Sequence, residues 1–190
     1  MSEQKTFTAM RLLVAIPCLN EATTIARVVQ NVPRLMPGVQ HVDVLVVDDG
    51  SSDETGSDAA TAGALVLRHP RNLGVGQAFQ TAVNYAVEQG YDLMVNIDGD
   101  CQFNPQDIPK LVQPVIAAQA DMVTASRFMD SEMTPNMSRV KLMGNHMMSY
   151  LISRLVRQNF HDVSCGFRCY SREALLQLNL HGSFTYTQET

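Results

Sequence analysis

Two aspartates one residue apart follow an apolar run near the middle of the chain. Leu93 to Ile97 forms the run, and Asp98 and Asp100 come directly after it. Gly99 stands between them and lets the backbone turn, so both carboxylates can face one hard cation. Gln102 can add a neutral oxygen to the same site. The spacing indicates a divalent-metal site, and an ordinary surface turn is the alternative because Asp and Gly are common turn residues.

Three other polar clusters also begin where an apolar run ends. These three runs are Leu12 to Ile16, Val42 to Val47 and Ala64 to Leu67. The run before Asp98 is the fourth candidate strand, and Asp121 to Ser126 is the fifth. Continuous apolar runs are typical of parallel strands buried on both faces. Segments with helical spacing alternate with them. We therefore expect an α/β fold with a mostly parallel, doubly wound sheet, helices on both faces and ligands at the carboxyl edge.

Local signals predict where several helices begin and end. Asn20 precedes an apolar helical pattern and is expected to be its N-cap. Gly90 is expected to close the helix that follows the third strand. Asn104 and Pro105 are expected to be the N-cap and first residue of the next helix, which Pro114 should kink or divide.

Composition excludes several classes of protein. At 190 residues, 45% hydrophobic and 17% charged, the chain has the makeup of one soluble globular domain. A net charge of -5 argues against a nucleic-acid binder and requires any anionic substrate to be held locally. The four cysteines lack metal-ligand spacing, and the sequence shows neither a signal peptide nor an apolar run long enough to cross a membrane. These features predict a cytoplasmic protein with reduced thiols.

The pattern changes beyond Arg127. Residues 128 to 138 predict a loop, and Arg139 to Arg157 predicts a long helix with methionines on its apolar face. That face is most simply core, while a patch that contacts lipid stays open. Arg172 to Leu178 predicts a short helix.

Five motifs in order resemble family 2 of the glycosyltransferases, with the dolichyl-phosphate mannose synthase and polyprenyl-phosphate glycosyltransferase subgroup as the best match. The motifs are Ile16 to Glu21, Val47 to Asp53, Arg71 to Gly76, Asp98 to Gln102 and Ser164 to Arg168. The resemblance runs from about Leu12 to Glu189 and implies the GT-A fold and glycosyltransferase activity. The family's domain continues past Thr190, so we expect one GT-A domain that is incomplete at its C-terminus.

The resemblance implies a donor site for a UDP- or GDP-sugar. The residues it assigns there are Pro17, Asn20, Glu21, Asp49, Gly50, Ser51, Asn72, Gly76, Asp98 and Gly99. Asp98, Asp100 and Gln102 would hold Mg²⁺ or Mn²⁺ against the two phosphates. The Asp49 carboxylate would accept hydrogen bonds from the base, and we expect it on a loop outside the core. An acidic turn or helix-start residue is the alternative for Asp49.

The resemblance also implies an acceptor site for a polyprenyl phosphate at a membrane surface. The cations it suggests are Arg127, Arg168 and either Arg139 or Lys141. Asp100, Arg127, Arg168 and Glu189 form the expected catalytic group. A phosphate acceptor is already an anionic nucleophile, so a strong general base is unnecessary. For each Arg the alternative is a solvated surface residue.

Two other functions stay open. A sugar, lipid or protein hydroxyl acceptor would need a carboxylate base, such as Glu189 or one beyond Thr190. A protein that binds sugar nucleotides without turnover is the second alternative. The sequence leaves the sugar, the choice of UDP or GDP and a homo-oligomeric state undecided, and it favours peripheral attachment to the cytoplasmic face of a membrane.

Overall fold

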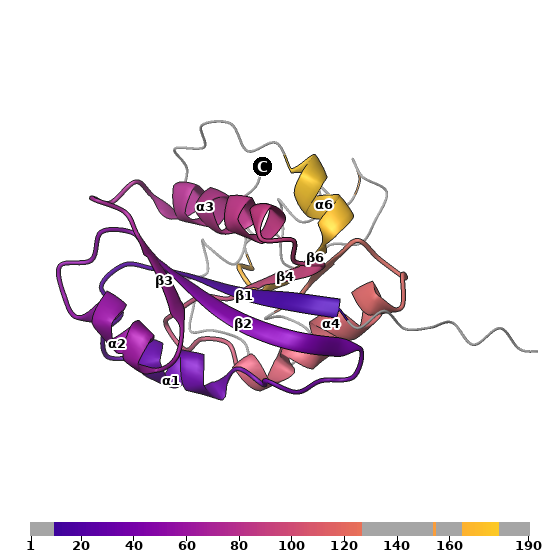
Figure 1. Ribbon diagram of the computed structural model, residues 1–190, viewed down its shortest axis with the longest axis horizontal. Coiled ribbons are helices and arrows are strands. Elements are labelled where there is room, and N and C mark those ends of the chain that lie inside the picture. Colours follow the sequence, from indigo (N-terminus) through magenta and orange to yellow (C-terminus); the bar gives the residue numbers. More distant parts are fainter. Residues whose placement is uncertain (1–9, 127–153, 155–164, 179–190) are drawn as a thin grey trace, which may run out of the picture. The chain divides into compact units, whose positions relative to one another are not determined.

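The computed structural model describes residues 10–126, 154 and 165–178 (Figure 1). Described residues up to Val123 and from Phe167 onward belong to one compact unit, and those between Thr124 and Gly166 belong to a second. The first unit carries the sheet and the polar clusters. Arg154 is the described part of the predicted long helix; it is helical and exposed.

A six-stranded sheet with the strand order β3-β2-β1-β4-β6-β5 forms the centre of the fold. Its strands are β1 (Met10–Cys18), β2 (Val39–Asp48), β3 (Leu65–Arg68), β4 (Leu93–Asn96), β5 (Met122–Thr124) and β6 (Arg168–Ser171). β1 pairs in parallel with β2 and β4, β2 pairs in parallel with β3, and β6 is antiparallel to β4. The predicted doubly wound, mostly parallel sheet is confirmed.

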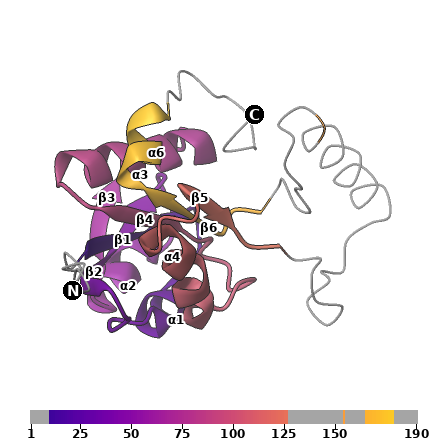
Figure 2. The ribbon, with the colours of Figure 1, turned by 90° about the vertical axis from the view of Figure 1, so that its right-hand side faces the viewer.

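Helices cover both faces of the sheet (Figures 1 and 2). α3 (Val75–Glu88) and α6 (Arg172–Gln177) lie on one face. On the other face lie α1 (Ile25–Asn31), α2 (Thr55–Thr61) and α4 (Ile108–Ile116), the last preceded by a 3₁₀ turn, η1 (Pro105–Asp107). Within the described part of the chain, every helix is too short or too polar to span a membrane.

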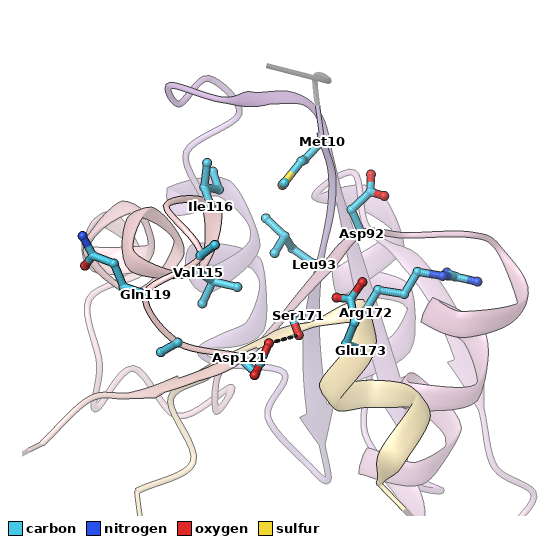
Figure 3. A pocket seen from close by; sticks show the side chains of 12 residues that line it. Met10, Asp92, Leu93, Val115, Ile116, Gln119, Asp121, Ser171, Arg172 and Glu173 are labelled. Atoms are coloured by element: carbon cyan, nitrogen blue, oxygen red, sulfur yellow. Dashed lines mark hydrogen bonds between the residues drawn. The ribbon is translucent and has the colours of Figure 1, made fainter. Parts of the chain in front are cut away.

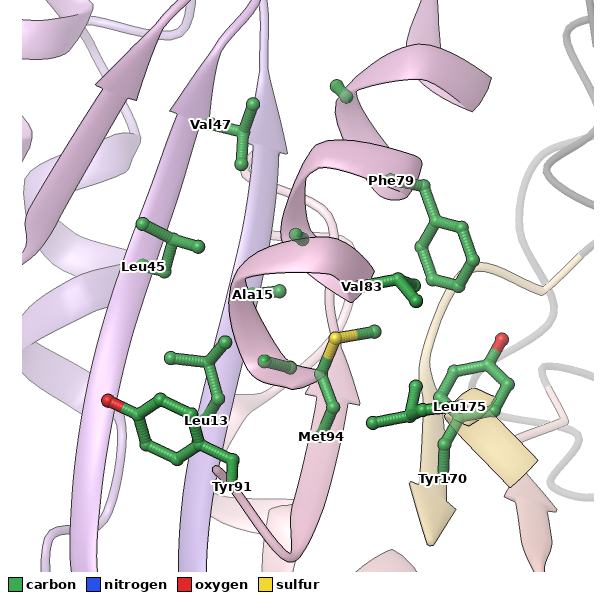
Figure 4. Packing of buried hydrophobic residues seen from close by; sticks show 13 residues of the cluster. Leu13, Ala15, Leu45, Val47, Phe79, Val83, Tyr91, Met94, Tyr170 and Leu175 are labelled. Carbon is green, nitrogen blue, oxygen red and sulfur yellow. The ribbon is translucent and has the colours of Figure 1, made fainter. Parts of the chain in front are cut away.

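The core between the sheet and α3 follows from the strand pattern (Figure 4). Alternate residues of β1, such as Leu13 and Ala15, point toward α3 and are fully buried. Phe79 of α3 packs beside Tyr170 of β6, with ring centroids 5.7 Å apart. The remaining members of this cluster are Leu45, Val47, Ala78, Ala82, Val83, Ala86, Tyr91, Met94 and Leu175. The strands are thereby fixed in register, which positions the loops that leave their ends.

The structure confirms some of the predicted helix boundaries and contradicts others. Asn104 accepts a hydrogen bond from the Gln106 amide and Pro105 begins η1, as expected. Gly90 follows α3 with a φ of 72° and donates its N–H to Val87, so it closes the helix as predicted. Pro114 lies within the last turn of α4 and does not divide that helix. α1 begins at Ile25 and not beside Asn20, so the predicted N-cap is wrong.

A pocket of about 440 Å³ opens at the amino-terminal edge of the parallel strands (Figure 3). Met10 and Leu93, the first residues of β1 and β4, line it together with Val115 of α4. Asp121 and Ser171, whose side-chain oxygens lie 3.3 Å apart, also line it. The polar clusters lie at the opposite, carboxyl-terminal edge.

Candidate active site

The polar clusters lie along one edge because four parallel strands end there. Cys18 at the end of β1 stands opposite Asp48 at the end of β2, which stands opposite Arg68 at the end of β3. β4 ends at Asn96 on the other side of β1. β1 and β4 are adjacent in the sheet, but β2 and β3, which follow β1 in the sequence, lie on the other side of β1. The strand order therefore reverses between β1 and β4, and ligands of doubly wound sheets bind at such a switch point.

The predicted metal motif packs directly on the end of β1. Asp98 and Asp100 are partly exposed in the turn after β4, and Gln102 is exposed. The Asp100 Oδ1 accepts a 2.9 Å hydrogen bond from the Gln102 amide, which orders the turn. Gly99 is buried, and a Cβ built on it would lie 2.8 Å from the Cys18 Sγ. The motif therefore tolerates only glycine at its centre while the thiol stays in place.

The donor set suits a divalent ion that also binds substrate. Within residues 10–126, 154 and 165–178, no group of three or more His, Cys, Asp or Glu side chains is placed to hold a metal. Mg²⁺ binds through one or two carboxylates and completes its shell with water and substrate phosphates. Asp98 and Asp100 fit that requirement, whereas two carboxylates are too few for a closed metal site made only of protein ligands.

Negative charge gathers around the Cys18 thiol. Burial and then the nearby carboxylates of Glu21, Asp48, Asp98 and Asp100 raise the pKa of Cys18, so the thiol stays protonated at neutral pH. Four carboxylates that act on one buried atom make this edge unfavourable for a diphosphate.

The loops after β1 and β2 are joined by hydrogen bonds. Asn20 has a φ of 58°, and its N–H donates to the Ser51 Oγ at 2.9 Å. Its side-chain oxygen accepts the Ser52 amide at 2.8 Å. The Glu21 N–H donates to the Thr55 Oγ1 at 2.8 Å. The side chain of Asn20 is thus used between loops, which explains why it does not cap α1.

Asp48 and Gly50 hold the loop after β3 against β2. The Asp48 carboxylate is fully buried, accepts the Ser51 amide at 2.8 Å and lies 3.4 Å from the Arg68 Nε. Gly50 has a φ of 80°, and a Cβ there would lie 2.5 Å from the backbone carbon of Arg71. The backbone at Arg71 and Asn72 therefore passes directly over Gly50.

Asp49 is only 4% exposed and contacts the loop after β3. Its carboxylate accepts the amides of Leu73 at 2.9 Å and Gly74 at 2.8 Å, and its Oδ1 lies 2.6 Å from the His69 Nδ1. Asp49 lies on a loop, as expected, but it is buried there because these three donors enclose it. Its contact with a base stays a prediction.

His69 is a site residue that the sequence pattern did not single out. Its Nε2 lies 2.9 Å from the Thr81 Oγ1 in α3, so the ring bridges Asp49 and that helix. The available signal was its position directly after β3, at the carboxyl edge of the sheet. The surrounding loop is rich in Arg, Pro and Gly, and this composition did not mark His69 as a site residue.

Arg168 begins β6 and is 6% exposed. This burial contradicts the alternative of a solvated surface residue. β6 is antiparallel, so its first residue reaches the carboxyl edge and stands opposite Asn96 of β4. Phe167 packs on Phe103, just after the metal motif, with ring centroids 5.3 Å apart. A buried guanidinium therefore belongs to the same edge as Asp98 and Asp100.

The remaining predicted residues divide into two groups. Pro17 lies within β1, Gly76 is buried in the first turn of α3, and Asn72 accepts the Gly74 amide at 2.9 Å. All three stand at or beside the carboxyl edge. Four predicted residues lie outside the described part of the chain, namely Arg127, Arg139, Lys141 and Glu189.

Sequence comparison decides the family. The model of glycosyl transferase family 2 matches residues 13–178, which is most of the chain. The chain belongs to glycosyl transferase family 2. This confirms the family that the five motifs resemble, and the expected class of enzyme, a glycosyltransferase, is the class of that family.

This family 2 chain is similar to named glycosyltransferases. The undecaprenyl-phosphate mannosyltransferase of Micrococcus luteus is 32% identical, over 90% of this chain and 70% of the relative. The UDP-N-acetylglucosamine–dolichyl-phosphate N-acetylglucosaminyltransferase of Methanococcus voltae is 29% identical, over 88% of this chain and 72% of the relative. The chain thus spans about 70% of the length of these relatives.

A solved structure confirms the fold. Glucosyl-3-phosphoglycerate synthase from Mycobacterium tuberculosis, in complex with Mn²⁺, UDP-glucose and phosphoglyceric acid, superposes with a TM-score of 0.62 at 25% identity. The match covers 86% of this chain and 57% of the solved one. The GT-A fold implied by the motifs is therefore the fold of this chain.

Proposed function

We propose that this chain is a metal-dependent, inverting glycosyltransferase that moves a sugar from a UDP- or GDP-sugar to a polyprenyl phosphate at the cytoplasmic face of a membrane. The observation that carries the proposal is the placement of a carboxylate pair and a buried Arg168 at one switch point of the sheet. Two relatives whose names specify undecaprenyl and dolichyl phosphates support the acceptor.

Asp98 and Asp100 would hold Mg²⁺ or Mn²⁺, with the exposed Gln102 beside them. When bound, the ion neutralises the charge that grows on the diphosphate as the glycosidic bond breaks. The protein's own part is positional. Gly99 fixes the carboxylate turn against β1, and the joined loops after β1, β2 and β3 provide the wall on which the nucleoside rests.

The acceptor phosphate needs charge and orientation more than a base. One of its oxygens attacks the anomeric carbon, the new C–O bond forms, and the nucleoside diphosphate leaves with the electron pair of the old bond. Arg168 supplies a guanidinium at the correct edge, and Arg can bind two phosphate oxygens at once. Arg127, together with Arg139 or Lys141, is proposed for the same acceptor, and Glu189 for the catalytic group.

A hydroxyl acceptor is the second candidate. The M. tuberculosis structure favours it, because that protein is named a glucosyl-3-phosphoglycerate synthase and its complex contains phosphoglyceric acid, a small soluble acid. A carboxylate base would then be required.

A competition assay separates the two candidates. The chain is mixed with Mn²⁺, UDP- and GDP-sugars, a short-chain polyprenyl phosphate in detergent, and phosphoglyceric acid. Mass spectrometry of the organic and aqueous phases identifies the product. The proposal predicts a polyprenyl-phospho-sugar in the organic phase. A glycosylated soluble acid without a lipid product would contradict the proposal and support a hydroxyl acceptor.

A further inference from the structure

Three of the four acceptor positions on the Asp49 carboxylate are used inside the protein. The Oδ1 accepts two donors, the Leu73 amide at 2.9 Å and the His69 Nδ1 at 2.6 Å. The Oδ2 accepts one, the Gly74 amide at 2.8 Å. A carboxylate offers about four lone-pair positions, two on each oxygen. Among the described residues, only one position on Oδ2 is left for a ligand.

The network also fixes which His69 nitrogen carries the proton. Both oxygens of Asp49 accept backbone N–H groups, as an ionised carboxylate does. The Nδ1 of His69 must then be the donor, and the Thr81 hydroxyl can donate to Nε2 at 2.9 Å. The His69 side chain is 11% exposed, so it is held between β3 and α3. The second position on Oδ1 is therefore filled by a fixed donor.

Nucleobases differ in how many donors they present to such a carboxylate. Uracil has one ring N–H, between two carbonyl groups. Guanine presents a ring N–H beside an amino group, and this pair of donors needs both carboxylate oxygens. We propose that Asp49, with Oδ1 closed by His69, selects a uridine nucleotide over a guanosine nucleotide. The inference rests on the proposed function and on the prediction that Asp49 contacts the base of the donor.

The cost of the wrong base follows from the unpaired donor. If guanine entered, one of its two N–H groups would meet the Asp49 Oδ2 and the other would face an oxygen with no free acceptor position. A buried donor without a partner loses its hydrogen bonds to water and regains none. Guanosine nucleotides should therefore bind at least ~10-fold more weakly than uridine nucleotides, which is equal to about 1.4 kcal/mol.

Titration calorimetry with three nucleotides tests the selection. UDP, GDP and 3-methyl-UDP, whose methyl group replaces the single ring N–H, are titrated into the full chain with Mn²⁺ present. We expect UDP to bind most tightly and both other nucleotides at least ~10-fold more weakly. GDP that binds as well as UDP, or 3-methyl-UDP that binds equally, overturns the inference and leaves the proposed function standing. No binding of any nucleotide overturns the proposed function itself.

Variants of His69 test its part as a positioning residue. His69→Leu removes the donor to Oδ1, so the preference for UDP over GDP should fall by about 3-fold or more. His69→Asn keeps a side-chain N–H and should retain more of the preference. His41→Leu is the matched control, because His41 also lies 3.0 Å from an aspartate, Asp43, but within the exposed start of β2. An unchanged preference in His69→Leu would make His69 merely structural and overturn its role.

Discussion

Gly99 lies directly against Cys18, so that a Cβ on the glycine would stand 2.8 Å from the thiol sulfur. Real Cβ atoms do not approach sulfur so closely, and the other neighbours of that Cβ, Ile16 and Glu21, would be at 3.6 and 3.7 Å. The centre of the metal motif and the end of β1 are therefore joined by one contact. Of these three neighbours only the sulfur is too close, so a side chain at position 99 requires the Cys18 thiol to move.

This contact predicts a rescue. Gly99→Ala should displace the Asp98–Asp100 turn and weaken Mn²⁺-dependent UDP binding at least ~10-fold, which is about 1.4 kcal/mol. Cys18→Ala removes the sulfur, so the double variant should recover most of the affinity, while Cys18→Ala alone should bind UDP nearly normally. Titration calorimetry of the three variants measures the coupling. A double variant no better than Gly99→Ala would contradict the contact.

Gly50 should be much less replaceable than another glycine with similar backbone. Gly50 and Gly63 have φ values of 80° and 93°, but a Cβ on Gly63 meets nothing within 4 Å. Gly63→Ala should cost about 1–2 kcal/mol of unfolding free energy from the left-handed backbone alone. Gly50→Ala should cost about 1–3 kcal/mol more, because its Cβ meets the backbone of Arg71. Urea denaturation measures both, and equal losses would show that the loops after β2 and β3 are not tightly packed.

Arg168 should matter for transfer and not for donor affinity. Arg168→Lys keeps the charge but loses the paired N–H donors, so the transfer rate should fall at least ~10-fold, about 1.4 kcal/mol, with the UDP Kd unchanged. Arg172→Lys is the control, since the Arg172 guanidinium donates to the backbone oxygens of Tyr91 and Val87 at the opposite edge. Equal transfer in both variants would remove Arg168 from the acceptor site.

Thiol labelling should report the integrity of the site. Cys18, Cys165 and Cys169 are buried, and burial raises the pKa of Cys18 as well as that of Cys169, the latter to about 12. A higher pKa leaves less thiolate, which is the reactive form. Cys101 is half-buried, so iodoacetamide at neutral pH should modify it first. Mass spectrometry that finds Cys18 labelled as fast as Cys101 would show that the end of β1 opens readily.

The apolar runs made β1, β2 and β4 predictable, because a strand buried on both faces needs apolar residues at nearly every position. β6 was not predictable in the same way. Its four residues include Arg168 and Ser171, and its strand conformation depends on pairing with β4, which is far away in sequence. Tertiary pairing decided its structure, and local propensity did not.

The site was predictable in its composition and not in its contacts. The carboxyl-edge rule placed Asp98 and Asp100 correctly after β4. Asn20 carried the usual signal of a helix cap, but its partners Ser51 and Ser52 come from another loop. Asp49 stands beside Asp48 in the sequence, and no local pattern shows that each is enclosed by different donors.

The claim on which the other conclusions depend is that this edge binds a nucleotide through a metal held by Asp98 and Asp100. Titration of UDP into the wild-type chain and Asp100→Asn, each in Mn²⁺ and in EDTA, tests it most directly. We expect tight binding only for the wild-type chain in Mn²⁺, with Asp100→Asn at least ~10-fold weaker, about 1.4 kcal/mol. Equal affinity in Mn²⁺ and EDTA would contradict the account.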